Sequence, residues 1–194
     1  MAMEFAFGVS RMRREGNYLF AWIPPPDSYW KLNIAEITEA NCSSTGVASI
    51  LRDDFGGFKG AVADTIKDVS QEFAALWAIN IGLSLAMRLG VEYLEVEGHS
   101  PFVLTLMIGS TEPSPNCLQL FNHIWDLMRH FKGIKLHQVF PDVNEAATLL
   151  AEHAGGLTSP VEFVRPPSYL VSVLQEDMLG RPVLHQARPR ENRN

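Results

Sequence analysis

One nearly uninterrupted apolar segment limits what this chain can fold into. Residues 73–89, FAALWAINIGLSLAMRL, are apolar almost all the way around a helical wheel, and a helix of that kind is buried on most of its sides. Asp68 or Ser70 can cap its start, with Gln71 as a capping-box partner for Asp68, and Gly90 ends it. The helix therefore needs a sheet and further helices to cover it.

Strand-like runs on both sides of this helix supply the sheet. Residues 31–38, 45–52 and 58–65 are short runs, and the last two are separated by the turn DDFGG. Strands joined by short turns indicate an antiparallel meander. Residues 92–97 and 134–140 follow as a fourth and a fifth strand.

Helical patterns separate and follow these later strands. We expect helices near 100–109, over 114–131 with an apolar stripe, over 142–156 and over 166–180. Asp142 and Glu145 have capping-box spacing at the start of the third of these. A meander followed by alternating helices and strands predicts an α/β fold with a five-stranded mixed sheet and helices on both faces.

The two ends of the chain differ from its middle. We expect residues 1–30 to form an extended N-terminal arm, because prolines 24–26 fix φ and remove donors. Residues 31–180 form the folded domain, and residues 181–194 a flexible Arg-rich tail. The domain carries nine basic and eighteen acidic residues, so a strongly basic groove for a phosphate backbone is not visible.

The bulk composition fits a protein of the cell interior. Two cysteines, Cys42 and Cys117, suit a reducing compartment, and no Cys/His cluster suggests zinc. The apolar runs are too short and interrupted for a membrane span. We expect an intracellular location, cytoplasmic or nuclear.

Five local sequences, in this order, resemble those of the ribonuclease H-like domain of plant retroelements and their domesticated relatives. They are PPPDSYWKLNIA, ILRDDFGG, QEFAAL, VEGHS and NEAATLLA, and the resemblance spans about residues 22–190. It implies the ribonuclease H-like fold. It also implies a nuclease that cleaves the RNA of an RNA–DNA hybrid with two Mg²⁺ ions held by four carboxylates.

The chain departs from that pattern at three of the four carboxylate positions. The resemblance places them at Ala35, Glu72, His99 and Thr148, and only Glu72 is acidic. Magnesium prefers oxygen ligands in octahedral geometry, so a methyl group, an imidazole and a hydroxyl are poor replacements. We expect that Mg²⁺ binding is lost, that Glu72 holds a metal weakly if at all, and that the chain is catalytically degenerate.

Neighbouring acids offer little compensation. Glu36 follows Ala35 and therefore faces the other side of the strand. Glu97 shares the face of His99 but lies roughly 6.6 Å along the strand. Glu145 is on a similar helix face to Thr148, but we expect it to serve the capping box.

Several functions stay open from the sequence alone. The favoured one is a degenerate ribonuclease H-like domain that binds RNA–DNA hybrid or other nucleic acid weakly. A second is an active nuclease with a rebuilt manganese site of Glu72, His99 and either Glu97 or Glu145; a Glu72–His99 pair could also hold one manganese or zinc ion. A third is a protein-interaction domain. No membrane partner is expected.

Overall fold

The main sheet of the molecule has seven strands. A computed structural model describes residues 2–7, 12–14, 17–38 and 43–185, and its strand order is β1-β8-β7-β4-β5-β6-β9. The strands are β1 (Ala2–Phe7), β4 (Trp30–Thr38), β5 (Ser44–Arg52), β6 (Phe58–Lys67), β7 (Tyr93–Gly98), β8 (Gly133–Gln138) and β9 (Val161–Phe163). Strands β2 (Met12–Arg14), β3 (Asn17–Phe20) and β10 (Val183–His185) form a small second sheet.

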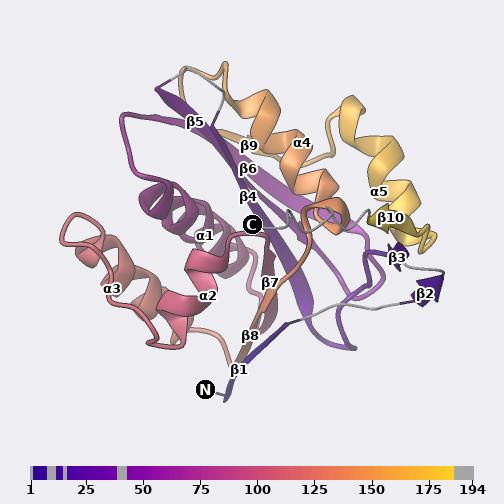
Figure 1. The fold of residues 1–194 in the computed structure, drawn as a ribbon, viewed down its shortest axis with the longest axis horizontal. Coiled ribbons are helices and arrows are strands. Elements are labelled where there is room, and N and C mark those ends of the chain that lie inside the picture. Colours follow the sequence, from indigo (N-terminus) through magenta and orange to yellow (C-terminus); the bar gives the residue numbers. More distant parts are fainter. Residues whose placement is uncertain (1, 8–11, 15–16, 39–42, 186–194) are drawn as a thin grey trace, which may run out of the picture.

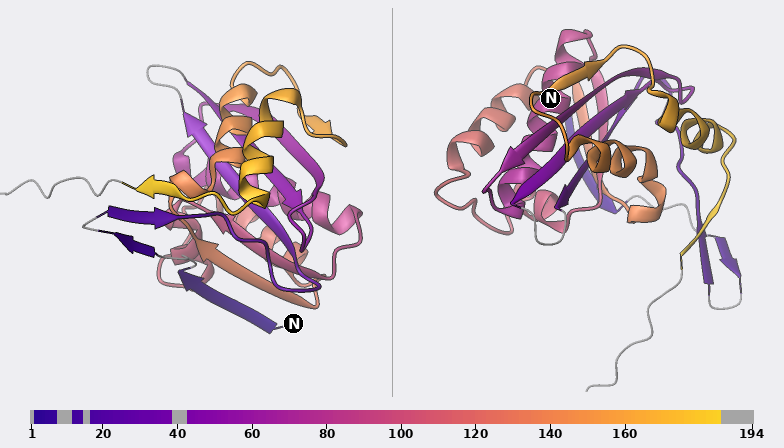
Figure 2. Two further views of the ribbon diagram at one scale, coloured as in Figure 1. Left: turned by 90° about the vertical axis from the view of Figure 1, so that its right-hand side faces the viewer. Right: turned by 90° about the horizontal axis from the view of Figure 1, so that it is seen from above.

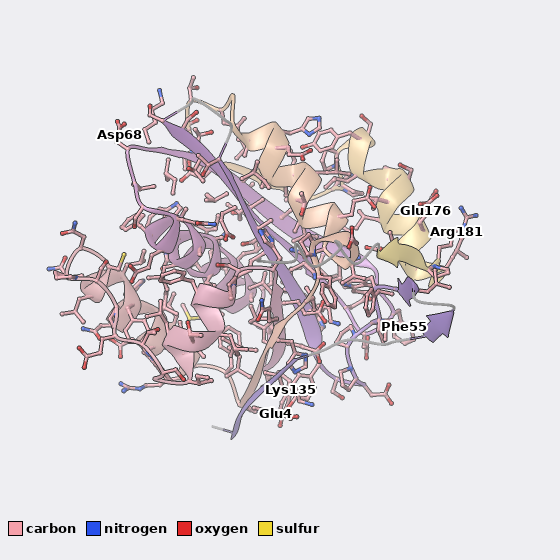
Figure 3. The ribbon with its side chains drawn as sticks, in the orientation of Figure 1. Glu4, Phe55, Asp68, Lys135, Glu176 and Arg181 are labelled. Carbon is pink, nitrogen blue, oxygen red and sulfur yellow. The ribbon has the colours of Figure 1, made fainter. Side chains whose placement is uncertain are left out.

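The five central strands are those that the sequence predicts. Strands β4, β5 and β6 form the antiparallel meander, and β4, β7 and β8 are parallel. The sheet is mixed, as expected, but it is wider than the predicted five strands. The short β9 adds one edge and β1, from the segment expected to be an extended arm, adds the other. Figure 3 shows Glu4 of β1 beside Lys135 of β8, where they form an ion pair of 3.4 Å.

Helices cover both faces of the sheet, as the sequence predicts (Figure 1). Helices α1 (Gln71–Arg88), α2 (Pro101–Met107) and α3 (Leu118–Met128) lie on one face, and α4 (Glu145–Ala154) and α5 (Val171–Met178) lie on the other. Figure 2 shows the same layers from two further directions. No described helix is long and apolar enough to cross a membrane.

Helix α1 is the apolar segment that the sequence singles out. The Ser70 side chain caps it by accepting a hydrogen bond from the Phe73 N–H, so Ser70 rather than Asp68 is the N-cap. The helix lies directly on the sheet at Gly82, where an added Cβ would come within 2.7 Å of a Leu32 methyl group. Its buried apolar side chains belong to the largest of the three hydrophobic clusters of the described residues.

Helix α4 packs even closer to the opposite face. A Cβ on Gly46 of β5 would lie 2.0 Å from the Ala151 carbonyl oxygen of α4. Small side chains line this contact, including Ala35, Ala48 and Ala147. The helix and the sheet therefore approach each other closely where the sequence provides only small residues.

The predicted capping box at the start of α4 is wrong. Asn144 is the N-cap residue and makes no capping hydrogen bond with its side chain, while Pro141–Val143 form a 3-10 turn before it. The Asn144 amide instead bonds to the carbonyl of Ile34 in β4, at 2.8 Å. A long-range contact has replaced the local one that the spacing favoured.

Residues at the C-terminal end divide between helix, strand and undescribed chain. The predicted helix 166–180 consists of a 3-10 turn, Ser168–Leu170, followed by α5. Val183–His185 pair with β3. The rest of the predicted tail, residues 186–194, lies outside the described residues.

Candidate functional site

Ala35, the first position that the resemblance assigns to a carboxylate, lies in the middle of β4. Its side chain is fully buried and contributes to the core beneath α4. It is opposite Ala48 of β5. This position offers no ligand atom and no polar contact.

Glu72, the one retained acid, lies in the first turn of α1. Its Oε1 accepts a hydrogen bond from the Ser114 N–H, at 2.9 Å. Ser114 belongs to the segment between α2 and α3. The carboxylate therefore fastens this connection to the start of α1.

His99 and Thr148 carry the other two substituted positions. His99 directly follows β7, and its buried Nδ1 has no hydrogen-bond partner in the part of the chain that the structure describes. Burial lowers the pKa of the His99 imidazole, so the ring is favoured in its neutral form. The Thr148 hydroxyl donates to the Asn144 carbonyl within α4, at 3.1 Å.

The strand pairing relates three of these four positions. Strands β4 and β7 are parallel with Ile34 opposite Gly98, so Ala35 and His99 are the next residues along each chain. Asn144 bonds to the Ile34 carbonyl and receives the Thr148 hydroxyl bond. Ala35 and His99 thus each follow one member of the Ile34–Gly98 pair, and two hydrogen bonds through Asn144 link Thr148 to Ile34. Glu72 is instead bonded to Ser114.

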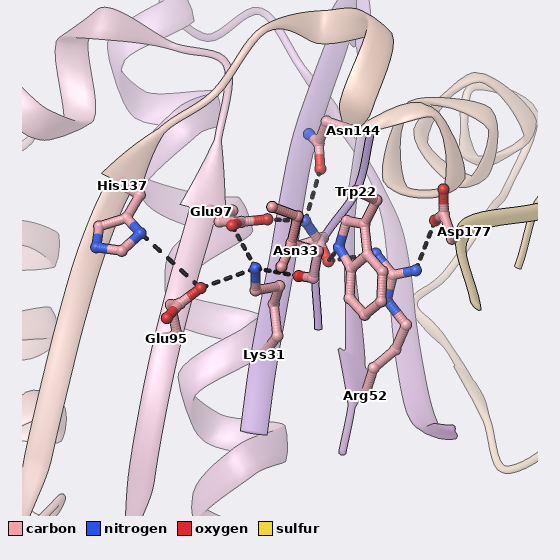
Figure 4. A network of polar contacts seen from close by, with 10 residues as sticks. Trp22, Lys31, Asn33, Arg52, Glu95, Glu97, His137, Asn144 and Asp177 are labelled. Atoms are coloured by element: carbon pink, nitrogen blue, oxygen red, sulfur yellow. Dashed lines mark hydrogen bonds and ion pairs between the residues drawn. The ribbon is translucent and has the colours of Figure 1, made fainter. Parts of the chain in front are cut away.

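A different set of ionisable residues forms a cluster. Among the described residues, the group of His, Cys, Asp or Glu side chains that could share one metal ion is Glu95, Glu97 and His137, whose ligand atoms lie within 4.8 Å of one another. Glu95 and Glu97 are alternate residues of β7, and His137 is opposite Glu97 on β8. They point to the face of the sheet that carries Lys31 (Figure 4).

Lys31 lies between the two carboxylates. Its ammonium group is 2.8 Å from Glu95 Oε1 and 2.5 Å from Glu97 Oε1, and it donates to the Ile23 carbonyl at 2.7 Å. Only 2% of the Lys31 side chain is exposed. A buried ammonium group needs such partners, because removing an unpaired charge from water is very costly.

Amide side chains extend this cluster across the sheet. Asn33 Nδ2 donates to Glu97 Oε2 at 3.0 Å and to Asn144 Oδ1 at 3.1 Å. Asn33 Oδ1 accepts hydrogen bonds from Trp22 Nε1 and from Arg52. Asn33 therefore links the N-terminal segment, the sheet and α4.

Arg52 is the second buried cation of the network. Its guanidinium group contacts Asp177 of α5 at 2.6 Å and lies over the Trp22 ring, with Cζ 3.5 Å from the ring centroid. Burial raises the pKa of the Asp177 carboxyl, and the charge of Arg52 partly offsets this. The pair fastens α5 to the sheet.

Glu36 lies apart from this network, on the other face of β4. It is buried, and one of its carboxylate oxygens lacks a hydrogen-bond partner within the described ranges. Burial raises its pKa to about 7 despite a hydrogen bond with Ser100. Its position agrees with the strand alternation expected from the sequence.

Sequence reasoning finds some of these residues and misses others. The sequence places Glu97 on the face of His99, but it predicts neither the ion pair of Glu97 with Lys31 nor the contacts of Glu95, His137 and Asn33. The available signal is the alternation of Tyr93, Glu95 and Glu97 along β7. That alternation normally marks a solvent-facing side of a strand. Here the sheet continues beyond β7 with β8 and β1, and the N-terminal segment lies beside these side chains.

Comparison with known proteins identifies the family. Residues 36–154 match the family described as reverse transcriptase-like. A protein of Arabidopsis thaliana, provisionally named a ribonuclease H protein, is 25% identical over 174 residues. That alignment covers 89% of this chain but 28% of the relative, so the chain spans less than a third of the curated protein that it matches.

Solved structures show the fold independently. The N-terminal RNase H domain of a Mycobacterium tuberculosis protein superposes with a TM-score of 0.61 at 21% identity, covering 65% of this chain and 92% of that one. RNase H1 of the archaeon Halobacterium salinarum gives 0.58 at 23% identity, with 65% and 95% covered. LC11-RNase H1, solved with an RNA/DNA hybrid, gives 0.59 at 16%, with 65% and 96% covered. The chain therefore has the RNase H fold and belongs to the reverse transcriptase-like family.

Proposed function

We propose that this chain is an RNase H-like domain that binds RNA–DNA hybrid but does not hydrolyse it efficiently. The observation that carries the proposal is the set of side chains at Ala35, Glu72, His99 and Thr148. They offer one carboxylate where the family resemblance implies four. The rest of the fold is kept, so the proposed loss concerns chemistry and not architecture.

The donor set at these positions does not fit two magnesium ions. Ala35 has no ligand atom, the Thr148 hydroxyl is used within its helix, and Glu72 is bonded to Ser114. His99 offers nitrogen, which magnesium does not favour. Two dications held close together for in-line displacement need dense negative charge, which these residues do not supply.

Hybrid binding is supported by fold likeness. LC11-RNase H1 has a similar fold and was solved with an RNA/DNA hybrid. The net charge of −9 over residues 31–180 opposes binding, so we expect weak affinity that depends strongly on salt, because phosphate contacts release counterions.

The binding test uses a fluorescent RNA–DNA hybrid with EDTA present, titrated with the complete chain at increasing KCl concentrations. We expect saturable binding that weakens steadily as KCl rises. The absence of binding at the lowest KCl concentration would contradict the proposal and would favour the protein-interaction function instead.

The second candidate is an active manganese-dependent nuclease with a rebuilt site. Glu97 is an unsuitable ligand for it because Lys31 and Asn33 occupy its two oxygens, and Glu145 is exposed at the start of α4. Cleavage of the hybrid with Mn²⁺, abolished by Glu72→Gln, would establish this candidate. We expect no such cleavage.

A further inference from the structure

A cavity of about 410 Å³ adjoins the buried charge cluster. The polypeptide of residues 21–26 forms one wall, Val139 and Val143 contribute apolar surface, and Lys31, Glu95, Glu97 and His137 contribute polar groups. Cavities of this size are large enough for small ligands. None of the four positions of the proposed function lines this cavity.

The charges around this cavity do not balance. Glu97 has both oxygens satisfied, by Lys31 and Asn33, and Arg52 is paired with Asp177. Glu95 shares Lys31 with Glu97, and its other ionic partner among the described residues is the His137 imidazole, which is a cation only when protonated. With the His137 imidazole neutral, the cavity lining holds one cation, Lys31, against two carboxylates, and the excess negative charge lies at Glu95, whose side chain is only 7% exposed.

His137 is placed beside this excess charge without a conventional hydrogen bond. Its Nδ1 is 3.8 Å from Glu95 Oε1, which is beyond hydrogen-bond distance. Its Nε2 is buried and has no hydrogen-bond partner among the described residues. Apart from this long ionic contact of Nδ1, neither ring nitrogen is therefore hydrogen-bonded within the described part of the chain.

The geometry points to a binding site for one divalent transition-metal ion between Glu95 and His137. Two metal–ligand bonds of about 2.0–2.2 Å at a tetrahedral angle separate the ligand atoms by about 3.4 Å. The 3.8 Å between His137 Nδ1 and Glu95 Oε1 is too long for a hydrogen bond, and the two atoms need to approach only slightly to bind one ion. A nitrogen and a carboxylate donor together suit zinc, cobalt or manganese better than magnesium.

The protein supplies two ligands to this site, Glu95 and His137. Glu97 is not a third ligand, because Lys31 and Asn33 bind its two oxygens. The Lys31 ammonium group keeps Glu97 and the Ile23 carbonyl as partners when Glu95 turns to the ion. The cavity has room for the water molecules that complete the coordination. This site is separate from the four positions of the proposed function, and its existence does not depend on that function.

Calorimetric titration of the complete chain with ZnCl₂ tests the inference, with Co²⁺ as a spectroscopic probe. We expect one equivalent of either ion to bind, and the Co²⁺ complex to show visible absorption. His137→Ala and the nearly isosteric Glu95→Gln should each weaken binding at least tenfold. His130→Ala is the matched control, because that exposed ring is hydrogen-bonded to carbonyl groups of α3, the helix just before it, and it should bind as tightly as the unmodified chain.

Thermal unfolding gives a second readout, because a ligand that binds only the folded state raises the melting temperature. Zinc should raise it in the unmodified chain and in His130→Ala, and not in Glu95→Gln. The inference is overturned if the unmodified chain binds no zinc or cobalt, or if Glu95→Gln and His137→Ala bind as tightly as the control. Should His137→Ala fail to fold, Glu95→Gln alone decides the question.

Discussion

At the scale of single residues, the molecule depends on a buried row of polar side chains along β4. Lys31 and Asn33 each satisfy partners from other elements. Their burial is tolerated because nearly every donor and acceptor in the row is used. Removing one member should therefore cost more than an average substitution.

Lys31→Met should lower the free energy of unfolding by about 3–5 kcal/mol, because it leaves two buried carboxylates without their cation. Denaturant unfolding measures the loss. Lys132→Met is the matched control, since that ion pair with Glu92 lies at the surface, and its stability should be unchanged within error. Equal stability of the two variants would show that the buried ion pairs of Lys31 do not stabilise the fold.

The raised pKa of Glu36 predicts that the free energy of unfolding depends on pH. Its pKa in the folded chain is raised from 4.5 to about 7, so between these values the folded state binds more protons than the unfolded state. Stability therefore falls as pH rises through this window. Glu36→Gln removes the effect.

The measurement is the difference in unfolding free energy between Glu36→Gln and the unmodified chain. It should shift in favour of the variant by about 1–3 kcal/mol between about pH 4.5 and pH 8. Glu92→Gln, a change at an exposed carboxylate, should show no such shift. A pH-independent difference for Glu36→Gln would contradict the raised pKa.

At the scale of elements, the close approach of α4 to the sheet positions the start of this helix beside β4. The contact relies on Gly46 and on small residues such as Ala35 and Ala48. The same packing explains why the Asn144 amide can reach the Ile34 carbonyl. A larger side chain at the contact would move the helix.

Gly46→Ala should destabilise the fold by about 1–3 kcal/mol or more, because the new methyl group meets the Ala151 carbonyl at 2.0 Å. Gly156→Ala is the matched control, since a Cβ there meets no atom of the described residues within 4 Å. Thermal unfolding of the two variants checks this prediction. A Gly46→Ala chain as stable as Gly156→Ala would mean that α4 is free to shift.

Sequence patterns predict elements better than they predict contacts between elements. Helix α1 and the five central strands follow from local periodicity, and Ser70 is one of the two caps that the sequence allows. The Asp142–Glu145 capping box is wrong because Asn144 is held by β4, more than a hundred residues away in sequence. Edge strand β9 has three residues, which is too short for a periodic signal.

At the scale of the whole molecule, the fold could be predicted from the order of five local sequences, but the buried network could not. Lys31, Glu95 and His137 lie on three different strands, β4, β7 and β8, and the sheet register brings them together. The assigned roles of Ala35, His99 and Thr148 remain predictions. They rest on the resemblance, and their placement around Ile34 is compatible with it.

Restoring the missing acids together tests whether those positions converge. The triple variant Ala35→Asp, His99→Asp and Thr148→Asp should bind Mg²⁺ in calorimetry, because the fold that positions the residues is kept. Single restorations should bind far more weakly, since such groups act as a unit. A folded triple variant with no Mg²⁺ binding would show that the four positions do not form one site.

The most direct measurement of the central claim is single-turnover cleavage of a labelled RNA–DNA hybrid by the unmodified chain in saturating Mg²⁺. With one carboxylate of four in place, we predict no cleavage above that of a Glu72→Gln chain. Cleavage at an enzyme-like rate that Glu72→Gln abolishes would contradict the account.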